Sequence, residues 1–148
     1  MAKYSRNRIH QAPTTIPPIV HLWLLRLLVA LGGHREFLSR HGFSNDAIAE
    51  VIGLAHWVDP SPREFEASIV RTELRQLHWA AETKWHGTSA PIELQNNVAR
   101  LARLVGLSNT DCRILEFAVL IQSERLLDDT ADWLGSLTSI KAFHALSV

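Results

Sequence analysis

SPREFEASIVRTELRQLHWAAETKW, residues 61–85, is the stretch that decides the fold class of this chain. Ser61 is placed to cap a helix, Pro62 suits the first helical position, and Glu64 can return a hydrogen bond to the N–H of the cap. The apolar residues that follow recur at the three- and four-residue spacing of an amphipathic helix. They are Phe65, Ile69, Val70, Leu74, Leu77 and Ala81. We therefore predict a long helix that starts at Pro62 and ends at Lys84 or Trp85.

Three shorter helices are expected before this stretch. The first begins near Pro18, because proline suits a first turn, and it stops at Gly32-Gly33. The second covers about residues 35–40. Ser44 is expected to cap the third, over residues 45–52, and the glycine that follows closes it.

Further helices are expected after residue 91. The fifth should bury a stripe and end at Gly106; the stripe consists of Leu94, Val98, Leu101, Ala102 and Val105. Ser108 caps the sixth, which is apolar almost all round over residues 114–121 and so belongs at the centre of the fold. Ser123 is expected to cap the seventh helix, and Gly135 to end it. Its inward-facing residues are Leu127, Thr130, Ala131 and Leu134. Residues 137–146 have a helical pattern again.

No segment alternates with the period of a strand between hairpin turns. The prediction is an all-α, compact domain of about seven or eight short helices, with hairpins like those of helix-turn-helix proteins. Residues 1–17 are expected to form a flexible basic arm, and residues 18–148 a single helical domain. Because the last residues contain no helix terminator, we expect this domain to be the N-terminal part of a longer chain.

Composition limits the class of protein. The chain has 148 residues, and its single cysteine, Cys112, excludes an internal disulfide framework. The apolar run over residues 19–31 is shorter than the ~20 residues of a membrane span, and His21 and Arg26 interrupt it. We therefore expect a cytoplasmic protein that does not enter a membrane.

The charges are unevenly distributed along the chain, although fifteen basic residues balance fifteen acidic ones. Residues 1–40 contain six basic and one acidic residue, whereas residues 41–148 contain nine basic and fourteen acidic residues. Anionic partners should therefore meet the N-terminal arm, and the helical body should favour basic protein surfaces or the arm itself.

No pattern of catalytic, cofactor-binding or metal-ligating residues emerges from the sequence. The seven glycines form no phosphate-binding loop, and the eight histidines lack the spacing of a zinc site. We expect no catalytic, cofactor or metal residue in this chain.

A helix-turn-helix interpretation rests on LARLVGLSNTDCRIL, residues 101–115. The side chains that would face a DNA groove are Asn109, Thr110 and Arg113. Asp111 lies among them and repels phosphate, and the following helix is nearly all apolar. DNA binding is therefore the alternative, and packing of a structural hairpin is the preferred interpretation.

The seventh helix has an acidic stripe. Glu124, Asp128 and Asp132 repeat every fourth residue, which costs a few tenths of a kcal/mol per like-charged pair. The stripe is either a solvated face or a docking site for a basic protein partner. Arg100 and Arg103 are candidate partners for it within the chain.

Residues 94–135 resemble a helical region that precedes the ATPase module in certain bacterial ATPases of the AAA superfamily. The resemblance rests on LARLVGLS (101–108), ILEFAVLI (114–121), Leu126-Leu127 and DWLG (132–135). It implies a non-catalytic N-terminal domain that recruits substrate or adaptor proteins, or regulates a downstream ATPase. ATP and Mg²⁺ are implied only for that downstream module, as is any oligomer formed through it.

Overall fold

The computed structural model describes residues 16–59 and 64–134, and within these ranges the chain is helical and contains no strand. The predicted all-α class is therefore confirmed. The α-helices of the described residues are α1 (Pro18–Leu25), α2 (His34–Phe37), α3 (Asp46–Ile52), α4 (Ala67–Trp85), α5 (Ile92–Val105), α6 (Asn109–Ser123) and α7 (Arg125–Asp132). A π-helical turn, Arg26–Ala30, continues α1, and a 3₁₀ turn, Ala55–Trp57, follows α3.

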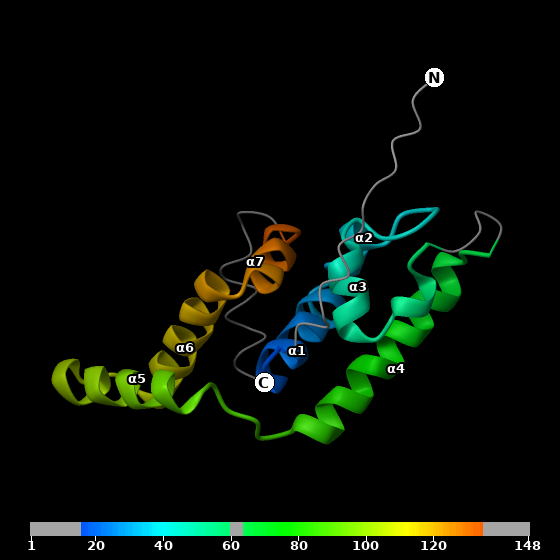
Figure 1. Ribbon diagram of the computed structural model, residues 1–148. Helices are drawn as coiled ribbons and strands as arrows, with labels where there is room; N and C mark the ends of the chain where they lie inside the picture. The colour runs from blue at the N-terminus through cyan, green and yellow to red at the C-terminus, as the bar shows by residue number, and fades with distance from the viewer. Residues whose placement is uncertain (1–15, 60–63, 135–148) are drawn as a thin grey trace.

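Helix α1 lies at the centre of the helical body (Figure 1), where it packs against α3, α4 and α7. It is apolar nearly all round, and a helix of that kind has to be buried on most sides. Its buried side chains are Ile19, Val20, Leu22, Trp23, Leu24 and Leu25. The expectation that the sixth helix is central is wrong, because α6 buries only Phe117 and Leu120 while Val119 is exposed.

The end of the first helix agrees with the prediction. The amide of Leu31 donates to the carbonyl of Arg26 (3.1 Å), a five-residue step that makes this turn π-helical. Gly32 then takes a φ of +82°, which glycine adopts without strain. At Gly33 a Cβ atom would lie 2.9 Å from the carbonyl oxygen of Leu27, so the chain needs a glycine there to turn.

Helix α4 begins at Ala67, so the predicted start at Pro62 is wrong. Glu66 occupies the N-cap position without a side-chain cap, and Ser61 and Pro62 lie outside the described residues. The reason lies in Phe65, which is buried and packs edge-on against Phe43 at 5.4 Å between ring centroids. Anchoring this ring leaves the backbone at Glu66 extended. The predicted end at Trp85 is confirmed.

Two other predicted caps are replaced by neighbouring residues. Asn45, not Ser44, caps α3 by accepting hydrogen bonds from the amides of Ala47 and Ile48 (3.1 and 3.3 Å). The Ser44 hydroxyl instead donates to the carbonyl of Glu36. At α7 the cap position belongs to Glu124, and the hydroxyl of Ser123 donates to the carbonyl of Leu120.

The second helix is shorter than the expected range of residues 35–40. It ends at Phe37 because Leu38 is extended and forms an isolated bridge with Phe43. The amide of Ser44 donates to the carbonyl of Phe37 (2.9 Å), which holds this turn closed. The arm over residues 1–15, Gly135 and the helical pattern over residues 137–146 lie outside the described residues.

Candidate protein-docking surfaces

Helix α5 lies at the margin of the molecule, and α6 is its main packing partner (Figure 1). The chain leaves α4 through residues 86–91, forms α5, and turns at Gly106, whose φ is +75°. Helix α6 then leads back to α7 and the central helix α1. The predicted helical hairpin is therefore present, and it carries α5 away from the core.

The C-terminal half of α5 exposes apolar side chains that the sequence pattern predicts to be buried. Only Val98 of the expected stripe is buried, whereas Leu101 is 41% exposed and Val105 is 61% exposed. Leu104, between them, is 82% exposed. The prediction fails because amphipathic spacing requires a cover for the apolar face, and the described part of the chain leaves these three side chains exposed. We call Leu101, Leu104 and Val105 the α5 apolar patch.

The residues of the DNA-binding interpretation lie together at the start of α6. Asn109, Thr110 and Arg113 are all exposed within its first two turns. Asp111 is among them, and Ser108 donates its hydroxyl (2.7 Å) and its amide (2.9 Å) to the carboxylate. These hydrogen bonds lower the pKa of Asp111 and keep a negative charge where phosphate would approach.

The acidic stripe divides between the end of α6 and helix α7. Asp128 and Asp132 are exposed on α7, whereas Glu124 is half-buried at the helix start. No ion pair joins this stripe to Arg100 or Arg103 within the described ranges, and the guanidinium of Arg103 donates to the carbonyl of Ala99 at 3.3 Å. The proposed internal pairing of these arginines with the stripe therefore has no structural support.

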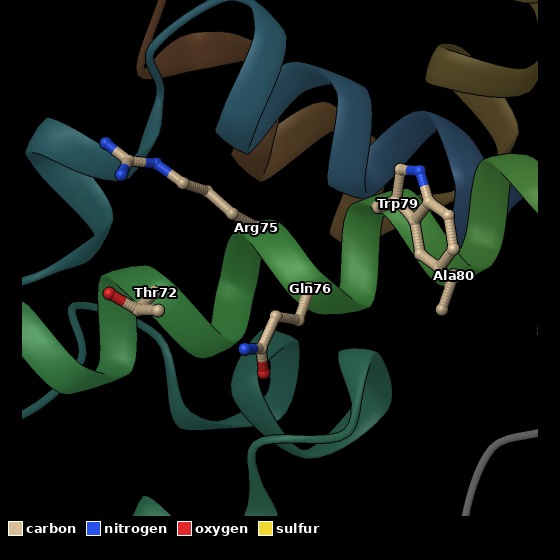
Figure 2. Close-up of a pocket in the computed structure, with 5 residues that line it drawn as sticks. All are labelled: Thr72, Arg75, Gln76, Trp79 and Ala80. Carbon is tan, nitrogen blue, oxygen red and sulfur yellow. The ribbon is translucent and has the colours of Figure 1, made fainter.

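A second exposed surface lies on the outer side of α4, and the sequence analysis missed it. Trp79 is 74% exposed there, beside a shallow hollow of about 510 Å³ (Figure 2). The hollow is lined by Thr72, Arg75, Gln76, Trp79 and Ala80, all from this one helix. The sequence does contain a pattern that indicates this surface. The long helix has an uncharged stripe opposite its buried stripe, and Trp79 lies in the uncharged one.

Comparison with known proteins identifies no relative: no family model, no curated protein and no solved structure matches this chain. Residues 16–59 and 64–134 contain no group of histidine, cysteine or carboxylate side chains that could hold a metal ion. None of the helices in these ranges has the length and apolarity that are needed to cross a bilayer. The most exposed apolar surfaces of the described residues lie on α4 and α5.

Proposed function

We propose that this chain is a non-catalytic helical docking domain that binds a partner protein through the α5 apolar patch. The partner in this proposal is the AAA ATPase module that the sequence resemblance places downstream of this domain. The domain then recruits substrate or adaptor proteins to that module, or regulates it. ATP and Mg²⁺ belong to the partner and not to this chain.

The observation that carries the proposal is the exposure of Leu104, at 82%, next to Leu101 and Val105. Their i, i+3, i+4 spacing places all three side chains on one face of the helix. A contiguous apolar patch with a charged rim is typical of protein interaction sites. Arg100 and Arg103 are exposed beside the patch and supply that rim.

The test is affinity capture from the source cells with the full chain as bait, followed by mass spectrometry. Leu104→Glu puts a charge into the α5 apolar patch, and Ala99→Glu puts the same charge on the opposite, exposed side of α5. We expect the wild-type chain and Ala99→Glu to retain an ATPase with a phosphate-binding loop, and Leu104→Glu to lose it. Captured proteins without such an ATPase, or equal capture by Leu104→Glu, would contradict the proposal.

The alternative function is DNA binding, and one observation favours it. Asn109, Thr110 and Arg113 are exposed at the start of the second helix of the hairpin, where a recognition helix contacts bases. A gel shift with mixed duplex DNA at low salt tests this alternative. Binding that falls steeply with salt and weakens in Arg113→Ala supports it, and the absence of any shift at low salt excludes it.

A further inference from the structure

We propose that the outer face of α4 is a second docking surface, which binds an acidic segment of a partner protein that carries a large apolar side chain. This surface is separate from the α5 apolar patch, and the inference does not depend on the function proposed for that patch. The side chains concerned project outward from one helix (Figure 2). The apolar side chain would lie in the hollow beside Trp79, and the carboxylates would meet the arginines next to it.

One exposed stripe along the outer face of α4 contains no charged side chain. Ile69, Thr72, Gln76, Trp79 and Thr83 follow one another at helical spacing and are all exposed. An exposed helix face is usually charged or polar, because the opposite face supplies the burial. Here the opposite face packs on the core through Val70, Leu74 and Ala81. Helix α4 therefore has a buried stripe and also an exposed stripe without charge.

Trp79 borders a hollow in this exposed stripe. The indole is 74% exposed, and it stands beside a shallow, open hollow of about 510 Å³. Tryptophan and arginine are the residue types that most often dominate interface energetics. Trp79 and Arg75 line the same hollow, one helical turn apart. A side chain such as leucine or phenylalanine would fit between Thr72, Gln76 and the indole.

The charges around the hollow define the partner. Arg71 and Arg75 are exposed one turn apart, a like-charged spacing that costs a few tenths of a kcal/mol in the free protein. No carboxylate pairs with either of them in the described part of the chain. Two carboxylates of α4 are already engaged, since Glu73 accepts from Trp57 and Glu82 accepts from Arg26. The exposed charges next to the hollow are therefore those of two arginines, which favour an acidic segment.

Two occupants from the chain itself fit less well. The N-terminal arm carries Lys3, Arg6 and Arg8, so the arginines of α4 would repel it. Helix α7 of a second copy would bring Asp128 and Asp132, but its Leu127 is completely buried and unavailable to fill the hollow. The surface requires carboxylates for its arginines and an accessible apolar side chain for its hollow. A separate partner protein with an acidic segment can supply both.

Selection from a displayed library of random peptides against the full chain tests the proposal. We expect enriched peptides to combine two or more carboxylates with one aromatic or leucine side chain. Their affinity, measured by fluorescence polarisation, should fall at least about tenfold in Trp79→Ala and in Arg75→Glu. Arg103→Glu makes the same charge change on α5 and should leave the affinity within about twofold. Circular dichroism checks that each variant remains folded.

Several outcomes would overturn the proposal. They are the absence of enriched peptides, enrichment without an acidic bias, and binding that Trp79→Ala leaves unchanged. A dimer in gel filtration that Trp79→Ala abolishes would instead make a second copy the occupant. Leu104→Glu should bind the selected peptides as wild type does, and a loss of binding in that variant would place their site on α5. That result would contradict this inference and leave the function proposed for the α5 apolar patch standing.

Discussion

Arg26 holds Glu82 through two parallel hydrogen bonds, from Nε to Oε1 at 2.6 Å and from Nη2 to Oε2 at 2.8 Å. The pair joins the π-helical turn after α1 to the last turns of α4, 56 residues along the chain. His78 approaches the same carboxylate at 3.2 Å. The hydrogen bond from Arg26 is the main cause that lowers the pKa of Glu82. The arginine that interrupts the apolar run of the first helix thus has a defined role in fixing α4.

Replacing Glu82 by Gln should lower the free energy of unfolding by about 1 kcal/mol, since the pair is bidentate but only partly shielded from water. Urea titration monitored by circular dichroism measures this change. Glu50→Gln is the matched control, because Glu50 is exposed on α3, away from the helix N-terminus, and has no ion pair within the described ranges. Equal midpoints for the two variants would show that the Arg26–Glu82 pair contributes nothing to stability.

Acidification should destabilise the protein through His21. This ring packs against Trp85 at 4.6 Å between centroids, and burial, followed by the charge of Lys84, lowers its pKa from 6.5. The unfolded chain then binds a proton more readily than the folded one. The free energy of unfolding should therefore fall as the pH drops from about 7 through 6.5, and the His21 contribution should level off below the folded pKa.

Urea midpoints at a series of pH values test this contribution, with His21→Gln as the comparison. We expect a shallower loss of stability in the variant than in the wild-type protein over that range. A histidine resonance titration by NMR gives the pKa of His21 directly. Parallel pH profiles for the two proteins would rule out a role for His21 in acid sensitivity.

The position of α1 at the centre predicts unequal effects of two leucine truncations. Leu24→Ala empties a completely buried site and should cost about 2–5 kcal/mol of unfolding free energy. Leu104→Ala removes a side chain that is 82% exposed and should change stability by less than about 0.5 kcal/mol. Thermal and urea unfolding of both variants measure the two losses of unfolding free energy. A large loss in Leu104→Ala would mean that the α5 apolar patch is covered in the isolated chain.

Several helix ends were predictable from the sequence, because a glycine or a capping serine within a few residues determines them. Gly32 and Gly53 end helices with positive φ angles, as a residue without Cβ allows, and Ser108 caps α6 as expected, in a capping box with Asp111. These features depend on hydrogen bonds within a few residues. They are therefore readable without knowledge of the fold.

Features that depend on distant residues were not predictable. The start of α4 is set by Phe65 packing on Phe43 and Trp57, which a local pattern does not contain. The spacing in α5 identifies an apolar face but not whether another helix covers it, so the pattern predicts a buried Leu101 where the side chain is exposed. Which apolar helix is central depends on how many neighbours pack around it. The uncharged stripe of α4 is readable in the sequence, but the hollow at Trp79 depends on how that helix packs.

The two serine caps predicted for the last helices provide a final comparison. Ser108 caps α6 by accepting from the amide of Asp111 (3.2 Å) and donating to its carboxylate, whereas Ser123 bonds only to the preceding turn. Ser108→Ala should therefore lower the melting temperature by a few degrees, and Ser123→Ala should leave it nearly unchanged. Ser108→Ala should also raise the pKa of Asp111, because the hydroxyl that lowers it is lost. Carboxyl titration by NMR reads this second effect, and an unshifted Asp111 would show that the cap is not formed in solution.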